Sequence, residues 1–152
     1  MPVLSLVPID SSGAPADAGL ELDDLARDVC ESTAGLYRRV GFVPPWVCYL
    51  AVFDEGVAGT CGFTAPPSAG RVEIAYYAFP RSEGRGIATS MARELLALPR
   101  AADPGVTVTA RTLRERNATV RILEKLGFTL EGTVLDPEEG EVWEWVLARG
   151  GA

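Results

Sequence analysis

A glycine-bearing turn between an apolar segment and an amphipathic helix constrains the fold of this chain more than any other feature. Segment 72–79 is apolar and predicts a strand, and the apolar spacing that starts at Ile87 predicts a helix over 86–98. Between them, Gly84 and Gly86 let the backbone approach a ligand closely. The first N–H groups of a helix have no partner inside it, and the helix dipole favours an anion there. Strand, glycine turn and helix start together predict a pyrophosphate site.

The length and composition are those of one globular domain, which we expect to span residues 1–152. A chain of 152 residues buries roughly 70% of its unfolded surface, enough for one core. Its hydrophobic fraction of 47% and charged fraction of 23% are ordinary for a globular protein. No apolar run approaches the roughly 20 residues of a membrane span, and the N-terminus lacks the basic start of a secretory signal. These features predict a cytoplasmic protein without membrane association.

The charge and the metal-binding residue types argue against several functions. The formal net charge of −7 disfavours binding to nucleic acid, which needs a basic surface. It would suit a cationic substrate, although solubility explains it equally well. The chain has no histidine, and Cys30, Cys48 and Cys61 are widely spaced. The sequence therefore predicts neither a metal site nor a disulfide framework, as suits a reducing compartment.

The hydrophobic pattern predicts seven strands and three helices. In chain order we expect a short strand near the N-terminus, a helix over 21–40, strands over 47–53, 57–64 and 72–79, a helix over 86–98, a strand over 106–112, a helix over 118–126, and strands over 128–134 and 141–147. Gly35 is a point at which the first helix could break. The crossover helix between 72–79 and 106–112 requires a parallel pair of strands. We therefore predict an α/β (α+β) fold whose mixed, mostly antiparallel sheet of about seven strands has helices on both faces.

Two motifs carry a resemblance to a known family. The first is segment 83–88, Glu-Gly-Arg-Gly-Ile-Ala, which aligns with an acyl-CoA loop of the form Gln/Arg-x-x-Gly-x-Gly/Ala. The second is segment 117–128, which starts with asparagine and ends in Glu-Lys-Leu-Gly-Phe. In this order, the two motifs resemble the GNAT superfamily of acyl-CoA-dependent N-acetyltransferases, over nearly the whole chain. The sequence around the loop is closest to the branch that includes ribosomal-protein N-terminal acetyltransferases.

The resemblance implies a GNAT-like fold and the transfer of an acetyl group from acetyl-CoA to a primary amine, by direct attack in a ternary complex and without a metal. It also implies which residues bind the cofactor. These residues are Ala78, Phe79, Gly84, Arg85, Gly86, Ile87, Ala88, Thr89 and Asn117. Asn117 has a second interpretation, because asparagine is a favoured N-cap where a helix begins. Arg81 and Arg85 are either phosphate contacts or solvated surface arginines.

Two positions depart from the family's pattern. Glu83 opens the loop where many members have Gln or Arg, and a carboxylate would repel a pyrophosphate. We therefore expect its side chain to point to solvent. Many members also have a tyrosine just before Glu-Lys-Leu-Gly-Phe that protonates the departing thiolate, whereas this chain has Leu123 there. The family's usual general acid is missing.

Glu73, Tyr77 and Ala78 are the candidate catalytic residues. An amine with a pKa near 10.4 is mostly protonated at neutral pH, and without histidine a carboxylate, a tyrosine or a water chain must take its proton. Glu73 lies in an apolar strand beside the loop, where burial would raise its pKa, and the family often uses a glutamate there through a water. The alternatives are a solvent-facing glutamate on the strand and an ion pair. Tyr76 and Tyr77 are candidates to align the amine or act as acid, although we expect at least one of them to be a core aromatic. A backbone N–H near Ala78 would polarise the thioester.

The sequence leaves the acceptor and the assembly open. Small-molecule and peptide amines both fit, and monomer and homodimer are equally compatible with the chain. The resemblance implies that the segment between the first helix and the next strand walls the acceptor site, and the aromatic residues there or nearby are Tyr37, Phe42, Trp46 and Tyr49. The alternatives of another class are an acyl-CoA-binding module without catalysis and a general nucleotide or phosphate binder.

Overall fold

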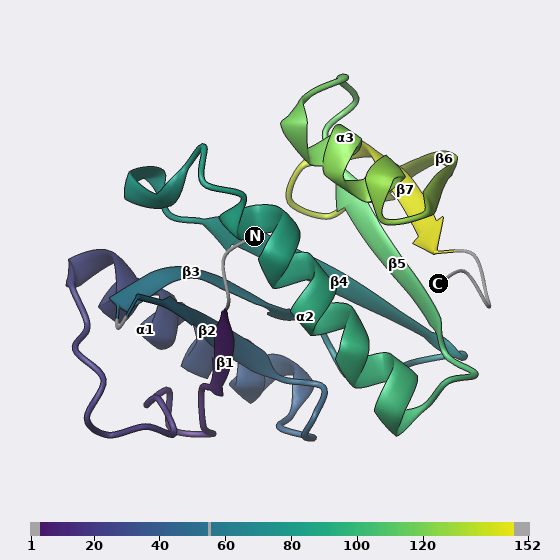
Figure 1. Ribbon diagram of the computed structural model, residues 1–152. Coiled ribbons are helices and arrows are strands. Elements are labelled where there is room, and N and C mark those ends of the chain that lie inside the picture. Colours follow the sequence, from purple (N-terminus) through teal and green to yellow (C-terminus); the bar gives the residue numbers. More distant parts are fainter. Residues whose placement is uncertain (1–3, 55, 148–152) are drawn as a thin grey trace.

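The computed structural model describes residues 4–54 and 56–147 and contains a single seven-stranded sheet within them (Figure 1). The elements, in chain order, are β1 (Ser5–Pro8), α1 (Asp24–Val40), β2 (Cys48–Phe53), β3 (Gly56–Phe63), β4 (Arg71–Ala78), the 3-10 helix η1 (Pro80–Ser82), α2 (Ile87–Ala102), β5 (Thr107–Thr112), α3 (Ala118–Lys125), β6 (Phe128–Asp136) and β7 (Gly140–Leu147). The predicted order of strands and helices is confirmed. Most boundaries differ from the prediction by one to three residues.

The sheet has the strand order β1-β2-β3-β4-β5-β7-β6. Every neighbouring pair is antiparallel except β4 and β5, which are parallel and are connected through α2. In Figure 1, α2 lies in front of the sheet and α1 lies behind it. The predicted mixed, mostly antiparallel sheet with helices on both faces is therefore confirmed.

The first helix is continuous through Gly35, so the prediction that it could break there is wrong. The Asp23 side chain caps the helix by accepting the Ala26 N–H at 2.9 Å. Arg38 and Arg39 in the last turn complement the helix dipole. A left-handed Gly41 (φ 93°) closes the helix, and these terminal interactions stabilise it around a single unfavourable glycine.

The second helix runs four residues beyond its predicted end at 98. Pro99 lies inside it and cannot donate a backbone hydrogen bond, but it stands in the last turn. The Asp103 N–H bonds to the Pro99 carbonyl at 2.8 Å, which completes that turn. Pro99 is itself buried, so its packing helps to hold the helix end in place.

Many of the largest fully buried side chains come from the sheet, from the residue after β4 and from α2. They include Trp145, Phe63, Phe79, Ile74, Ile87, Met91 and Leu95. Gly59 of β3 lets α2 lie close to the sheet, because a Cβ there would lie 3.0 Å from the Met91 Cε and 2.5 Å from the Tyr77 carbonyl oxygen. This packing fixes the start of α2 against the end of β4, where the glycine turn lies.

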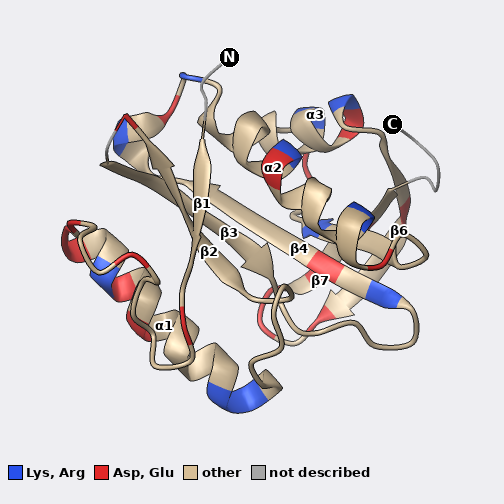
Figure 2. Ribbon diagram, turned by 60° about the horizontal axis from the view of Figure 1, so that its bottom comes forward, with Lys and Arg blue, Asp and Glu red and all other residues tan. Residues whose placement is uncertain are grey.

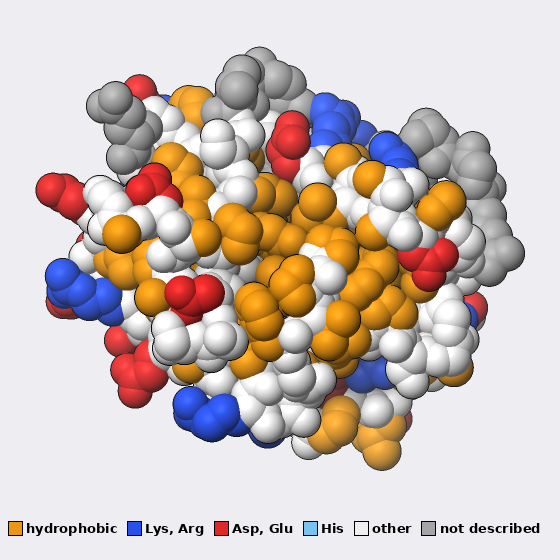
Figure 3. Space-filling model, turned by 90° about the horizontal axis from the view of Figure 1, so that it is seen from below, with side chains coloured by type: hydrophobic (Ala, Val, Ile, Leu, Met, Phe, Trp, Pro, Cys, Tyr) orange, Lys and Arg blue, Asp and Glu red, His pale blue; other side chains and the backbone are white. Residues whose placement is uncertain are grey.

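Hydrophobic side chains also reach the surface. In the view from below they gather in the middle of the face, and most acidic and basic groups lie towards its rim (Figure 3). Contiguous apolar surface of this kind commonly accommodates ligands or partners. None of the helices described is long and apolar enough to cross a membrane.

Candidate active site

The turn between β4 and α2 has a backbone that only glycine adopts readily. Gly84 (φ 78°) and Gly86 (φ 74°) are both in the left-handed region. Gly86 is the N-cap of α2, and no side chain caps the helix in the structure as described. The N–H groups of Ile87, Ala88 and Thr89 therefore begin a helix whose positive end is open to a ligand.

A cavity of about 530 Å³, which we call the donor cavity, lies beside this helix start. Its lining comes from the end of β4, the glycine turn, α2 and α3, and consists of Tyr76, Tyr77, Ala78, Ser82, Glu83, Gly84, Gly86, Ile87, Ala88, Thr89, Ala118, Thr119 and Ile122. Six of the nine cofactor residues predicted from the sequence line it. Phe79, Arg85 and Asn117 are not among its lining residues.

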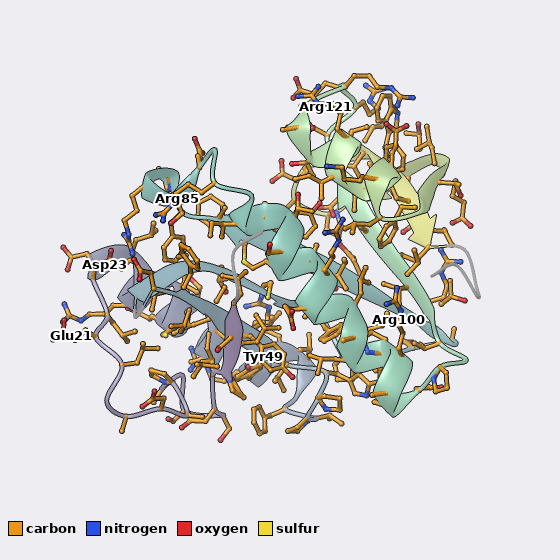
Figure 4. The ribbon with its side chains drawn as sticks, in the orientation of Figure 1. Glu21, Asp23, Tyr49, Arg85, Arg100 and Arg121 are labelled. Carbon is orange, nitrogen blue, oxygen red and sulfur yellow. The ribbon has the colours of Figure 1, made fainter. Side chains whose placement is uncertain are left out.

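The side chains of these three residues and of Arg81 make contacts within the protein itself. Phe79 is fully buried, and the Arg85 guanidinium lies 4.9 Å from the centre of the Phe53 ring. Arg81 pairs with Asp23 and donates to the Val57 carbonyl at 2.7 Å. Figure 4 shows Arg85 and Asp23 at the same end of the molecule. Arg81 thus ties the start of α1 to the segment that follows β4.

Asn117 caps α3, since its Oδ1 accepts the Val120 N–H at 3.2 Å. In the structure Asn117 therefore acts as the N-cap, the second of its two interpretations. The helix it starts contributes Ala118, Thr119 and Ile122 to the donor cavity. These three residues were missed in the sequence, although their spacing places them on one side of a helix.

The strands β4 and β5 separate beside the donor cavity. Their pairing runs from Arg71–Thr107 to Ile74–Ala110, and no further pair follows among the described residues, although β4 continues to Ala78. The Phe79 N–H bonds to the Ala58 carbonyl at 2.9 Å, so odd-numbered residues of β4 hydrogen-bond to β3. The backbone N–H groups of Tyr76 and Ala78 consequently face the side where β4 and β5 part.

A second cavity of about 530 Å³, which we call the acceptor cavity, lies between α1 and strands β3 and β4. It is lined by Leu25, Asp28, Val29, Ser32, Thr33, Leu36, Arg39, Cys48, Thr60, Cys61, Gly62, Phe63, Thr64, Ala75, Tyr76 and Tyr77. Tyr76 and Tyr77 line both cavities. Two ligand-sized spaces therefore meet at the C-terminal half of β4.

The four aromatic residues expected to wall the acceptor site are not among the residues that line this cavity as described. The Tyr37 hydroxyl donates to the Ile9 carbonyl at 2.8 Å and accepts the Cys48 N–H at 3.0 Å. The Tyr49 hydroxyl donates to the Pro45 carbonyl at 2.6 Å. These aromatic groups hold loops and strands together, and one side of α1 forms the cavity wall instead.

Glu73 lies in a cluster of charged residues. Figure 2 shows acidic and basic residues next to each other along β4, close to β7. The Glu73 Oε1 is 4.0 Å from the Arg111 Nε and 3.4 Å from the Thr64 Oγ1. Arg111 also pairs with Asp136 at 3.1 Å and with Glu144 at 3.3 Å. Burial raises the pKa of the Glu73 carboxyl, and the Arg111 guanidinium offsets part of that rise.

Glu73 does not line either cavity, but its neighbours Thr64 and Ala75 line the acceptor cavity. The ion-pair interpretation of Glu73 is thus realised in the structure. A half-buried carboxyl with a raised pKa at the edge of a cavity is also a candidate base. The ion pair and the role of base thus belong to the same side chain, and the kinetics of a Glu73 variant distinguish between them.

Position 123 offers no proton donor, because the Leu123 side chain is a hydrocarbon, and it is fully buried. Tyr76 and Tyr77 are the phenols nearest the junction of the two cavities. Within the residues described, the Tyr76 hydroxyl is buried without a hydrogen-bond partner, and burial raises its pKa. Tyr77 is 46% exposed and its ring lies 5.6 Å from that of Phe79.

A seven-stranded sheet that splits beside an uncapped helix start, with a cavity on each face of the sheet next to the split, defines an acyltransferase of the GNAT type. A family model described as acetyltransferase (GNAT) domain matches residues 21–129. The chain belongs to this family of acetyltransferases.

Solved structures of the same family share the fold. A GNAT-family acetyltransferase from Bordetella pertussis superposes with a TM-score of 0.65 at 20% identity, over 95% of each chain. The RimL ribosomal-protein alpha-N-acetyltransferase in complex with coenzyme A superposes with a TM-score of 0.67 at 19% identity, over 98% of this chain and 96% of that one. An aminoglycoside acetyltransferase in complex with coenzyme A gives 0.59 at 23%, over 69% and 67%. A search of curated protein sequences finds no match.

Proposed function

We propose that the protein transfers an acetyl group from acetyl-CoA to a primary amine, by direct attack within a ternary complex. The observation that carries this proposal is the meeting of two cavities at Tyr76 and Tyr77. One cavity has an open helix start suited to a pyrophosphate, and the other is large enough for a second substrate. A module that only binds acyl-CoA would have no use for the second cavity.

In this proposal the donor cavity holds the coenzyme. The N–H groups at residues 86–89 bind the pyrophosphate, and the pantetheine arm enters where β4 and β5 part. The arm then bonds to backbone groups that β5 leaves unpaired. The Ala78 N–H, which faces that side, polarises the thioester carbonyl. Coenzyme A in the RimL and aminoglycoside acetyltransferase structures, which have the same fold, supports this choice of ligand.

The amine enters the acceptor cavity and loses its proton to Glu73 through water. Glu73 precedes Ala78 by five residues, about 16 Å along an extended strand, so the carboxylate cannot reach the reacting amine directly. A water chain at the edge of the acceptor cavity bridges this distance. General base catalysis of this kind contributes about 10²–10⁴-fold, and positioning of the two substrates contributes more.

The departing thiolate takes its proton from Tyr77 or from water. Tyr77 lines both cavities, which supports a role for it beside the amine and the sulfur. Its second expected role is to align the attacking amine. In this proposal the reaction therefore has a proton donor even though position 123 is not a tyrosine.

Ligand-induced thermal stabilisation and turnover test this function. Coenzyme A at about 100 times its Kd should stabilise the fold by about 2.7 kcal/mol, a rise in Tm of roughly 5–10 °C. ATP and NAD lack the pantetheine arm and should stabilise it less. A panel of primary amines with acetyl-CoA should then release free thiol. Stabilisation by ATP but not by coenzyme A would contradict the proposal.

A further inference from the structure

The wall that α1 presents to the acceptor cavity carries a carboxylate near its start and a cation at its end, with apolar and hydroxyl side chains between them. The α1 residues that line the cavity are Leu25, Asp28, Val29, Ser32, Thr33, Leu36 and Arg39. Most of them recur at intervals of three or four, as expected for one side of a helix. Among the described lining residues, Asp28 is the one carboxylate and Arg39 is the one cation.

The orientation of α1 shows which charge is nearer to the acetyl donor. Asp23, at the start of the helix, pairs with Arg81 of η1, directly after β4. Tyr37, near its end, bonds to Cys48, whose partner Gly62 pairs in turn with Ala75. The helix therefore runs from the donor end of the acceptor cavity to its far end. Asp28 lies nearer to the donor, and Arg39 lies about 16 Å further along the helix.

The two charged groups are available to a ligand. Asp28 and Arg39 are both exposed, and neither forms an ion pair with another residue in the described part of the chain. The Arg39 guanidinium donates to the Gly35 carbonyl at 3.3 Å, which uses one of its five N–H groups. Glu73, near the far end, is already paired with Arg111.

On the basis of the proposed function, we infer that the acceptor is an elongated zwitterion. It carries its reactive ammonium group at the Asp28 end, an apolar body along Leu36 and Phe63, and a carboxylate at the Arg39 end. A peptide with two apolar residues near its free amino terminus and an acidic residue fourth has this chemistry. Four extended residues and a glutamate side chain span roughly 14 Å, close to the separation of the two charges.

Polycationic amines fit this cavity less well. A polyamine or an aminoglycoside presents several ammonium groups, whereas the described lining offers one carboxylate and a cation. Burial of a second ammonium against Leu36 and Phe63 would be unfavourable without a partner. The whole chain has a net charge of −7, whereas the described lining of the acceptor cavity has one carboxylate and one cation.

Two tetrapeptide amides that differ only in their last residue test this inference. Both begin with alanine, leucine and valine; one ends in glutamate and the other in arginine, which adds no second amine that acetyl-CoA would modify. We expect kcat/KM to be about three- to fivefold higher for the glutamate peptide, the size expected of an exposed ion pair. Replacing leucine and valine by serine should lower kcat/KM about tenfold or more, because the apolar contact is lost.

A charge reversal at the far end provides the decisive comparison. Arg39→Glu should reverse the preference, so that the arginine peptide becomes the better acceptor. Arg38→Glu is the matched control, since Arg38 is also exposed and in the last turn of α1 but does not line the cavity. It should leave the preference of the wild-type protein unchanged.

The outcomes separate this inference from the proposed function. A wild-type preference for the arginine peptide, or an Arg39→Glu variant with an unchanged preference, would overturn the zwitterion while acetyl transfer stands. Efficient acetylation of spermidine or kanamycin with neither peptide modified would overturn it too. Failure of coenzyme A to bind, with no thiol release from any amine, would overturn the proposed function itself.

Discussion

At the scale of single residues, Glu73 forms an ion pair with Arg111 and is also a candidate general base. Its pKa is raised chiefly because it is partly buried, and the nearby Arg111 limits the rise. A carboxyl with a raised pKa in the folded state is stabilising when protonated, and this contribution is lost as the pH rises through the folded pKa. Above its folded pKa, the ionised Glu73 therefore contributes less to stability than it would with an unshifted pKa, while its basicity is increased.

We predict that Glu73→Gln keeps the fold and the affinity for coenzyme A but lowers kcat at pH 7 by about 10²–10⁴-fold. Its Tm at pH 7 should equal or slightly exceed that of the wild-type protein, because the desolvated charge is gone. The acidic limb of the pH profile of kcat should disappear as well. Stopped assays over a range of pH and thermal denaturation measure these effects.

Glu131→Gln is the control for that experiment. Glu131 belongs to the same group of charges and pairs with Arg71 at 2.9 Å, but it has no ion pair with Arg111 in the described structure. It should change neither kcat nor its pH profile. If Glu73→Gln turned over at the wild-type rate, the base would have to be another group.

At the scale of elements, the start of α2 depends on a left-handed residue at its N-cap. Gly86→Ala places a Cβ on a backbone with φ 74°, which costs about 1–2 kcal/mol. It also adds bulk at the turn where we propose that the pyrophosphate binds. We predict at least a tenfold loss of affinity for coenzyme A by calorimetry, together with a modest fall in Tm.

Gly70→Ala separates strain from binding. Gly70 has the same φ of 74°, a new Cβ would meet nothing within 4 Å, and the residue lies in the turn before β4, away from the donor cavity. The variant should lose similar stability and bind coenzyme A normally. Equal affinities for both variants would show that the glycine turn does not hold the coenzyme.

The elements were predictable from the sequence because each depends on a local pattern. Alternating apolar residues, the glycines after β4 and the Asp23 cap are all visible within a few positions. The contact partners of three other residues were not predictable, because they lie far away in the sequence. Arg81 pairs with Asp23, 58 positions away; Arg85 contacts Phe53, 32 positions away; and Tyr37 bonds to Ile9, 28 positions away. Likewise, the wall of the acceptor cavity depends on how α1 packs across β3. A helical stripe in the sequence does not show what it faces.

At the scale of the whole molecule, the two cavities lie largely on opposite faces of the sheet. The donor cavity is lined by α2 and α3, which lie in front of the sheet in Figure 1, and the acceptor cavity is lined by α1 behind it. Among the residues that the structure describes, only the end of β4 contributes to both. Each substrate can therefore occupy its cavity while the other is bound, which favours direct transfer between them.

The cysteines give no support to a covalent route. Cys48 and Cys61 line the acceptor cavity, but burial raises the pKa of Cys48 to about 11 and raises that of Cys61 further. At pH 7 about one Cys48 thiol in 10⁴ is then a thiolate, the form that attacks a thioester. No histidine exists to activate either thiol.

We therefore predict that double-reciprocal plots intersect when acetyl-CoA and the amine are varied together. Mass spectrometry after incubation with acetyl-CoA alone should show no acetylated protein. Cys48→Ala, which removes the thiol on the wall of the acceptor cavity, should change KM for the amine more than kcat. Parallel plots, with an acetyl group on Cys48 or Cys61, would instead establish a covalent intermediate. The same plots with the Glu73→Gln protein should still intersect, since the base acts after both substrates have bound.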